Sequence, residues 1–334
     1  MLPKVYVILV NWNGEKDTIL CLDSLLTVNY DNMHVVISDN GSEAQSIHVL
    51  KEWAQFNMRR VPSSDTAFFM ENECLSIKTL CLLENRKNLG FTGANTVGIN
   101  YALQNNAEYV LLLNNDTRVT ENFLIQMIEV GEGNSAYGML GCKTYFAENE
   151  SVAGKKRIWS LGGYEYVYGN PMNIGSKQFD LMEWKGVREN EMICGCCMLI
   201  KRAVIERIGV QDDDLFFGID DVEYSLRAAK HGWKNALVLD AEIYHSGSRS
   251  VEGLTGLQLY YLFRNTYYFR VKYFPWYRNI IFFVHHLSRY FLMGGIKRIF
   301  LGRGYANRGM FLGIFDFLSQ RMGPCPHVSL LKEI

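Results

Sequence analysis

The chain has 334 residues, a formal net charge of -1, 48% hydrophobic residues and 21% charged residues. This length is enough for a large core and more than one lobe. The near-neutral charge does not favour nucleic acid as a partner, so we expect none. The eight cysteines do not form the paired C-x-x-C clusters of zinc sites. Without a signal peptide in the sequence, they predict reduced thiols in a cytoplasmic protein.

The first 45 residues predict two strand–turn–helix units. Residues 5–10 form an apolar run that predicts a buried strand, and residues 16–26 have apolar side chains at helical spacing. Residues 34–39 predict a second strand, and Ser42 with Gln45 suits a capping box for the helix that follows. Two such units in succession predict a parallel sheet whose polar turns open on one edge.

The next segment predicts an inserted loop, a third strand and a glycine-rich loop. Residues 60–76 show no periodicity and are interpreted as a loop before a strand over residues 78–84. Residues 85–95 contain several glycines, and a helix follows through Ala102. The glycine spacing is not G-x-G-x-x-G, which argues against a dinucleotide-binding dehydrogenase. We expect this loop to bring the backbone close to a phosphate or ribose.

An all-apolar run, Tyr109–Leu113, stops at Asn114, Asn115 and Asp116. Such a run predicts a buried central strand, and ligands of open α/β sheets bind at the carboxyl ends of strands. A carboxylate beside amides suits a divalent cation that carries phosphate oxygens. The alternative is an ordinary turn, since Asn and Asp are common turn formers.

Alternating elements continue after this strand. We expect a helix over residues 121–130, a strand over 137–144, and irregular strands and loops over 154–190 that form one wall of a cleft. A buried strand over 191–201 and a short helix, Arg202–Ile208, follow. Gly209 fits the end of that helix.

Three acidic residues, Asp220, Asp221 and Glu223, open a predicted helix that runs to Lys230. The helix dipole favours acidic residues in a first turn and accounts for one or two of them. A cluster beside three further aspartates, at 212–214, is repulsive, and suits a site that uses a metal, a hydroxyl or a proton relay.

A predicted strand over residues 234–239 leads to His245, which stands among small polar residues. A single histidine is more often structural than catalytic. A histidine just past a strand end is nevertheless a candidate metal ligand.

The stretch from residue 253 to 315 contains no Asp or Glu, nine Lys or Arg residues, and many aromatic residues. Basic, aromatic, amphipathic helices favour an anionic membrane surface or a lipid-linked substrate. The alternative is a helical extension that packs on the core or forms a homodimer with a second subunit. No apolar run is long and clean enough to span a bilayer. We therefore expect at most a peripheral contact with the inner face of the plasma membrane.

Taken together, these motifs resemble family two glycosyltransferases, in particular the bacterial rhamnosyltransferase-like branch, over most of the chain. The matching motifs, in order, are VVISDNGS, ENRKNLGFTGANTVG, LLLNNDTRV, FFGIDDVEYSLRAAKHGW and HSGSRS. The resemblance implies an α/β fold of the GT-A type, with a Rossmann-like, mostly parallel sheet flanked by helices. Residues 1–118 would be the nucleotide-binding half and 119–250 the acceptor half of the catalytic domain, and residues 251–334 a basic, aromatic helical extension.

The resemblance also implies roles for the donor side of the site. Asn11 and Asp39 would face the nucleoside, and Asp39 would accept from a pyrimidine imide N–H. Asn85, Gly90 and Asn95 would shape the loop around the ribose and phosphates.

A divalent metal is implied at the end of the central strand. Asp116 would bind Mg²⁺ or Mn²⁺ that bridges the diphosphate, with Asn114 beside it and His245 completing the site. The family's Asp-x-Asp motif is Asn-Asn-Asp in this chain, which lowers the charge of the ligand set.

The implied reaction is transfer of a sugar, with inversion, from a nucleoside-diphosphate donor to a glycan or lipid-linked acceptor of a surface polysaccharide. Rhamnose from dTDP-rhamnose is the first expectation. Asp221 would be the general base, followed in preference by Asp220 and then Glu223. Inversion needs one base on the acceptor hydroxyl and positive charge on the leaving diphosphate, not a retaining carboxylate pair.

Two other classes of function were weighed against this one. A nucleotidyltransferase would need a glycine-rich, basic signature after the first strand, where this chain has NWNGEK. A catalytically inactive nucleotide- or carbohydrate-binding scaffold would make Asp116, Asp221 and His245 dispensable.

Overall fold

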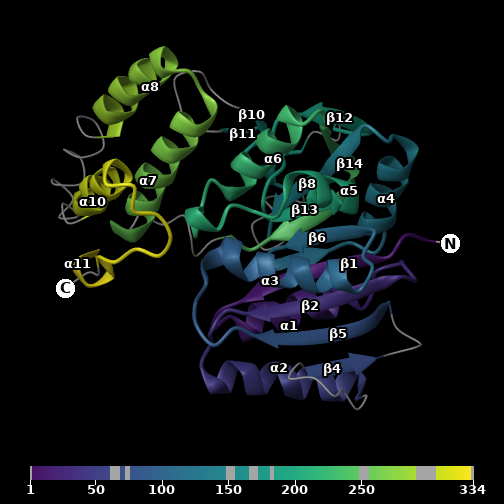
Figure 1. The fold of residues 1–334 in the computed structure, drawn as a ribbon. Helices are drawn as coiled ribbons and strands as arrows, with labels where there is room; N and C mark the ends of the chain where they lie inside the picture. The colour runs from purple at the N-terminus through teal and green to yellow at the C-terminus, as the bar shows by residue number, and fades with distance from the viewer. Residues whose placement is uncertain are drawn as a thin grey trace.

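A computed structural model describes residues 2–60, 68–71, 76–147, 155–164, 172–180, 184–247, 256–290 and 306–331. These residues form an α/β body built on one large sheet, with a group of C-terminal helices beside it (Figure 1). The mixed α/β architecture confirms the fold class expected from the alternating pattern of strands and helices.

The sheet runs in the order β12-β14-β8-β13-β6-β1-β2-β5-β4-β3, with β7 and β9 attached to β14 and β8. In chain order its strands are β1 (Val5–Asn11), β2 (Met33–Asp39), β3 (Arg59–Arg60), β4 (Phe68–Glu71), β5 (Ile77–Glu84), β6 (Tyr109–Leu113), β7 (Thr117–Val119), β8 (Tyr137–Phe146), β9 (Ile158–Ser160), β12 (Val187–Asn190), β13 (Cys197–Lys201) and β14 (Lys234–His245). A separate two-stranded sheet pairs β10 (Gly163–Tyr164) with β11 (Met172–Asn173).

The carboxyl ends of six strands meet at one edge of this sheet. Strand β1 is parallel to β2 and β6, and β2 is parallel to β5. Strand β13 runs antiparallel between β6 and β8, so that β8 and its parallel partner β14 point the same way as β6. Asn11 lies opposite Asp39 in the register, which confirms that the first two polar turns open on one edge.

Helices cover both faces of the sheet, because the strands are apolar on both sides. Residues of α1 (Glu15–Leu25), α2 (Ala44–Asn57) and α4 (Phe123–Gly133) pack into one core cluster. Residues of α3 (Gly90–Gln104), α5 (Arg202–Ile208) and α6 (Asp220–Lys230) pack into a second. Near-continuous apolar strands are the pattern expected for a sheet buried on both faces.

Three expectations about the first half of the chain are corrected. Part of the predicted loop over residues 60–76 is strand, because β4 pairs antiparallel with β5 and buries Met70. Residues 61–67 and 72–75 lie outside the described part. Helix α3 begins at Gly90, so the glycine-rich loop is shorter than predicted. Ser42 does not cap α2 and instead accepts hydrogen bonds from Asn11 and Asn13.

Two strand boundaries in the second half also differ from the prediction. Strand β13 begins only at Cys197, because residues before it form a turn in which the Cys197 N–H donates to the Cys194 carbonyl. Strand β14 continues to His245, because an irregularity between Val238 and Glu242 lets pairing with β8 resume. His245 therefore sits on the last position of a strand.

The basic, aromatic tail is helical where it is described. It comprises α7 (Gly256–Tyr273), α8 (Trp276–Ser288), α10 (Ala306–Leu318) and the short α11 (Val328–Leu331). Helix α10 lies close against α7, since a Cβ added to Gly309 would stand 1.8 Å from the Gly256 carbonyl oxygen. Among the described residues, no helix combines the length and apolarity needed to cross a membrane.

Candidate active site

The residues predicted to face the nucleoside of the sugar donor, Asn11 and Asp39, lie in a closed network of hydrogen bonds at the sheet edge. We call this region the donor corner. The Asn11 amide nitrogen donates to Asp39 Oδ2 at 2.8 Å, and the Ser42 N–H donates to Asp39 Oδ1 at 2.9 Å. Thr18 Oγ1 donates to Asn11 Oδ1 at 3.0 Å. Asn11 and Asp39 are fully buried. The structure therefore brings Asn11 and Asp39 together as predicted, but their side chains hydrogen-bond to each other.

Of the three loop positions predicted around the ribose, Gly90 and Asn95 contact the second half of the chain and Asn85 contacts the first. The Asn85 amide donates to a serine hydroxyl of β2 at 2.8 Å. Gly90 has φ +79, and an added Cβ would stand 2.4 Å from the Phe216 carbonyl oxygen, so the glycine makes room for protein backbone. Asn95 is buried and donates to Gln211 at 2.9 Å. That the loop brings its backbone close to a phosphate or ribose stays a prediction.

The residues predicted to bind a metal, Asn114, Asp116 and His245, lie where β6 and β14 end, and we call this region the metal corner. His245 Nε2 is 3.0 Å from Asp116 Oδ1 and 3.1 Å from the Asn114 amide nitrogen. Burial raises the pKa of Asp116, but the hydrogen bond and charge of His245 outweigh burial, and the pKa lies below its ordinary value. Among the described residues, the buried atoms Asn114 Oδ1 and His245 Nδ1 have no hydrogen-bond partner. Orphaned buried polar atoms often mark a place for an ion or ligand.

This corner fits a divalent cation only if a substrate completes the coordination. In the described part of the chain, no three His, Cys, Asp or Glu side chains are grouped for a metal. Asp116 and His245 present an oxygen and a nitrogen that converge, with the Asn114 amide alongside. Mg²⁺ is commonly held in this way, by one or two carboxylates together with substrate phosphates and water.

The two acids at the start of α6, Asp220, which is buried, and Asp221, which is half-buried, form a dyad. Asp221 Oδ2 accepts from the Gly195 N–H at 2.9 Å, which holds the carboxylate against the turn before β13. Burial raises the pKa of Asp221, against the opposing effect of the backbone N–H groups. Burial and the charge of Asp221 raise the pKa of Asp220 to about 7. Like charges in a dry site share protons in this way, and such pairs suit proton transfer.

Glu223, the third candidate base, has a structural role. Its carboxylate is fully buried, and it pairs with Arg227 at 3.0 Å and Lys272 at 3.2 Å and accepts from the Tyr273 hydroxyl. The same lysine pairs with Asp212 at 2.6 Å, which explains part of the acidic cluster predicted from the sequence. These acids fasten α6 to α7, leaving Asp221 and Asp220 as the candidates.

Helix α7 also holds the loop that leads to the dyad. The Arg264 guanidinium donates to the carbonyls of Asp214 and Leu215. The Asn265 amide donates to the carbonyl oxygens of Leu215, Phe217 and Gly218 at 2.8–3.2 Å. Both side chains are fully buried. We call Arg264 and Asn265 the α7 clamp. No sequence pattern predicted it, because an arginine inside a basic tail gives no sign that it is buried.

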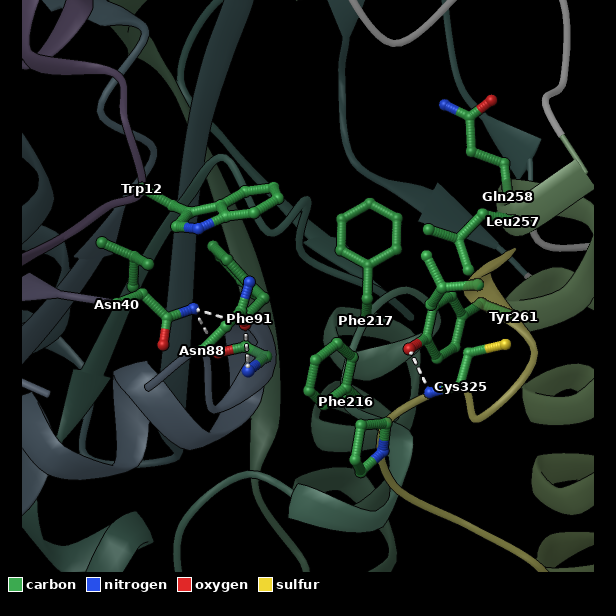
Figure 2. Close-up of a pocket in the computed structure, with 14 residues that line it drawn as sticks. Trp12, Asn40, Asn88, Phe91, Phe216, Phe217, Leu257, Gln258, Tyr261 and Cys325 are labelled. Atoms are coloured by element: carbon green, nitrogen blue, oxygen red, sulfur yellow. Dashed lines mark hydrogen bonds between the residues drawn. The ribbon is translucent and has the colours of Figure 1, made fainter. Parts of the chain in front are cut away.

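A cavity of about 580 Å³ lies between the donor corner and the C-terminal helices. Trp12, 59% exposed, points into it from the turn after β1, and Phe217, 47% exposed, points into it from the loop before the dyad (Figure 2). The remaining lining residues are Val10, Asn40, Asn88, Gly90, Phe91, Phe216, Leu257, Gln258, Tyr261, Pro324, Cys325 and Val328. Trp12 was not predicted, although an aromatic residue directly after a strand end was the available signal.

Two thiols lie beside the dyad. Cys196 Sγ stands 3.3 Å from Cys194 Sγ, and this hydrogen bond lowers the pKa of Cys194 despite burial. The charge of Asp221 acts to raise that pKa, and the charge of His245 acts to lower it. Cys194 is therefore within electrostatic reach of both the dyad and the metal corner.

This arrangement defines a class of protein. A mixed α/β sheet with a metal corner and a carboxylate dyad at its carboxyl edge has the organisation of a GT-A glycosyltransferase. The family model for Glycosyltransferase like family 2 matches residues 3–258, more than half of the chain. The chain belongs to this family and is a glycosyltransferase, as the motifs predicted.

Individual relatives are distant but cover most of the chain. The dTDP-rhamnosyl transferase RfbF of Shigella flexneri is 22% identical over 80% of this chain and 80% of its own. The low-salt glycan biosynthesis hexosyltransferase Agl10 of Haloferax volcanii is 23% identical over 80% of this chain and 75% of its own. The mannosyltransferase PcManGT of Pyrobaculum calidifontis, solved with GDP-Man and Mn²⁺, has a TM-score of 0.53 and 16% identity over 99% of this chain and 79% of its own. It supports the GT-A fold.

Proposed function

We propose that this enzyme transfers a hexose from a nucleoside-diphosphate sugar, with inversion, to a glycan or lipid-linked acceptor in surface polysaccharide biosynthesis. The observation that carries the proposal is that His245 lies 3.0 Å from Asp116, while the turn before β13 accepts from the Asn114 N–H through the Cys196 carbonyl and donates to Asp221 through the Gly195 N–H. dTDP-rhamnose is the first donor to test, because the relative RfbF is a dTDP-rhamnosyl transferase. The relative Agl10 and the fold neighbour PcManGT favour testing other hexoses as well.

The donor would lie across the carboxyl ends of β1, β2 and β6. The base would stack on the exposed Trp12 ring, since aromatic faces bind bases through their π-systems. Asn11 and Asp39 would form the floor of this corner, with the Ser42 turn fixed above them. Direct contact between Asp39 and an imide N–H would require that turn to open.

The diphosphate would reach the metal corner. Asp116 and His245 would hold Mg²⁺ or Mn²⁺ together with the phosphate oxygens, with Asn114 beside them. When bound, the ion would stabilise the charge that develops on the leaving diphosphate. The Mn²⁺ in the PcManGT complex supports this choice of ion.

Asp221 would accept the proton of the acceptor hydroxyl. The Gly195 N–H donates to Asp221 Oδ2 and the Val222 N–H donates to Asp221 Oδ1, each at 2.9 Å. Each carboxylate oxygen has a second lone pair, which would accept the proton of the acceptor hydroxyl. A raised pKa makes the carboxylate a stronger base at neutral pH, which improves general base catalysis. Asp220 would share the charge of the pair, and its pKa of about 7 keeps the dyad from carrying two full charges.

We assign residues 1–118 to donor binding, 119–250 to acceptor binding, and 251–334 to a C-terminal extension that contacts a membrane. A homodimer through the C-terminal helices is the alternative use of that extension. Arg264 and Asn265 support a close link between the extension and the dyad.

A donor panel tests the proposed function. The protein is incubated with dTDP-rhamnose, UDP-sugars and GDP-sugars, and release of the nucleoside diphosphate is measured with and without Mn²⁺ and a membrane extract as acceptor. We expect turnover with one donor, and a product whose anomeric configuration, determined by NMR, is inverted. Binding without turnover for every donor would favour the inactive scaffold of the same fold.

A further inference from the structure

Helix α8 is apolar on the side that faces away from the protein. Its inner side packs on α7, where Phe282 and His286 are buried and the His286 ring lies 4.6 Å from the Phe263 ring. On its outer side, Trp276 is 74% exposed and Val284 is 67% exposed. The outward apolar side chains of α8 are Trp276, Tyr277, Ile280, Ile281, Val284 and Leu287. A helix that is apolar all round is normally covered all round.

The neighbouring helix α10 extends this apolar surface. Phe311, Phe315 and Leu318 are exposed and lie four and three residues apart, so they share one face of the helix. The two helices contact each other through the Phe283 and Phe317 rings. Figure 1 shows α8 and α10 on the side of α7 that is turned away from the large sheet. The exposed apolar side chains on the outer face of α8 and α10 are grouped, whereas exposed apolar residues on an ordinary protein surface are scattered singly.

The charge around this face is positive. Arg278 and Arg289 are exposed near the two ends of α8, and Arg308 is exposed near the start of α10. Between residues 253 and 315 there is no acidic side chain to neutralise them. Asp316, the first acid after this stretch, is fully buried and accepts from the Tyr260 hydroxyl at 2.7 Å.

We propose that the outer face of α8 and α10 docks on the surface of an anionic lipid bilayer. Apolar side chains would enter the acyl boundary, and Arg278, Arg289 and Arg308 would contact the anionic head groups. Trp276 and Tyr277 are residue types that favour the interface between water and hydrocarbon. No described helix has the length and apolarity for a span, so the helices would lie on the bilayer.

Charge distinguishes a bilayer from a second copy of the chain as the partner that covers this face. A two-fold dimer would place the same patch on both subunits and bring arginines together without an acidic partner from residues 253–315.

Docking at this face would fix the position of Asp220 and Asp221 relative to the bilayer surface. Helix α7 packs against α8 and also clamps the loop at 214–218 through Arg264 and Asn265. This consequence rests on the proposed function, because a lipid-linked acceptor gives the enzyme a reason to work at a bilayer. The docking itself can be measured without donor or acceptor.

Vesicle flotation of the full chain tests the proposal. Phosphatidylcholine vesicles with and without phosphatidylglycerol are compared at low and high NaCl, for the wild type and the double variant Ile280→Glu/Val284→Glu. We expect the wild type to float with the anionic vesicles and to be released by salt, and the double variant to lose binding by about tenfold or more. No binding by the wild type, or equal binding by the double variant, would overturn the proposal.

Two controls separate docking from folding and from self-association. Phe56→Glu changes a 90% exposed side chain on α2 and should leave flotation unchanged. Equal melting temperatures would show that the double variant is folded, as expected for exposed positions. Light scattering without vesicles should show the same mass for wild type and double variant; a wild-type dimer that the double variant dissociates would assign the face to a second copy and overturn the proposal.

Discussion

The donor corner and the metal corner lie on the same sheet edge, yet their polar atoms are satisfied differently. Asn11 and Asp39 exchange hydrogen bonds with each other and with the turns around them, and both are fully buried. At the metal corner, Asn114 Oδ1 and His245 Nδ1 have no partner among the described residues. The first arrangement fixes backbone geometry, and the second keeps capacity to bind a ligand.

The acid groups of α6 show the same contrast within one helical turn. The Glu223 carboxylate pairs with Arg227 and Lys272 and accepts from the Tyr273 hydroxyl, and these contacts hold two helices together. Asp220 and Asp221 are held mainly by amide N–H groups, and burial raises the pKa of both. A paired buried carboxylate stabilises the fold, whereas an unpaired acid dyad is suited to chemistry.

The largest expected effect comes from Asp221→Asn, which keeps the shape of the side chain and removes the base. We expect kcat to fall by about 10²–10⁴-fold, the usual contribution of a general base. Donor affinity, measured by calorimetry, should be unchanged. Asp213→Asn is the matched control, because the Asp213 side chain is exposed and accepts a hydrogen bond from the Thr96 hydroxyl. Wild-type turnover by Asp221→Asn would move the base elsewhere.

A second prediction compares the dyad with Asn265, the residue of α7 that positions the loop leading to Asp220. Asn265→Ala removes the amide that donates to the Leu215, Phe217 and Gly218 carbonyls, of which only that of Leu215 keeps the Arg264 guanidinium as a donor. We expect a loss of about 1–3 kcal/mol in the free energy of unfolding. Because the loop leads to Asp220, kcat should fall while donor affinity is kept. Asn105→Ala, which loses one hydrogen bond at the end of α3, is the control for urea unfolding. Equal unfolding midpoints for the two variants would show that the clamp is unimportant.

The Asp220→Asn variant separates the two acids of the dyad by pH. Because Asp220 is protonated below about pH 7, its replacement by asparagine should leave the acid limb of the pH–rate profile in place and remove only an inflection near pH 7. Asp220 has a pKa of about 7 when folded and an ordinary value of 3.8, so the folded state binds the proton more tightly. Stability of the wild type therefore falls as pH rises through this window.

The same variant has a predicted thermal signature. An asparagine cannot ionise, so the melting temperature of Asp220→Asn should exceed that of the wild type by a margin that grows from pH 4 to pH 7. Scanning calorimetry across this range provides the measurement. A constant difference between the two proteins would mean that Asp220 does not titrate in this window.

The smallest expected effect concerns the thiol beside the dyad. Of the seven cysteines in the described part, Cys194 is the one that is not buried, and its pKa is lowered by the Cys196 thiol. We expect iodoacetamide to label Cys194 before the other six, without a change in melting temperature. Peptide mass spectrometry, with Cys194→Ser as control, provides the measurement. Faster labelling of Cys21 or Cys142 would contradict the geometry of this corner.

Sequence patterns predicted the parts of the fold that local chemistry determines. Apolar runs located β1, β2 and β6, and acidic residues at a helix start located α6 at Asp220. The short strand β4 was missed, because four residues with one fully buried side chain give too short a pattern. The end of β14 was misplaced, because a break in pairing near Asp240 resembles a strand end.

Sequence motifs predicted which residues belong to the candidate site, but they did not predict most of the contacts that these residues make. Asn114, Asp116 and His245 were grouped from the sequence, and the structure places them within hydrogen-bonding distance. The burial of Asp39, the pairing of Glu223 and the role of Gly90 depend on residues far away in the chain. No local pattern encodes such contacts, because tertiary packing decides them.

The central claim is that Asp116 and His245 form a metal-assisted diphosphate site. The most direct test is calorimetric titration of dTDP, UDP and GDP into the wild type and Asp116→Ala, with and without Mn²⁺. We predict that one nucleotide binds tightly only with Mn²⁺, and that Asp116→Ala loses this metal-dependent part by about 10–100-fold. Equal binding with and without Mn²⁺ in both proteins would contradict the account and shift the neutralising charge to basic side chains.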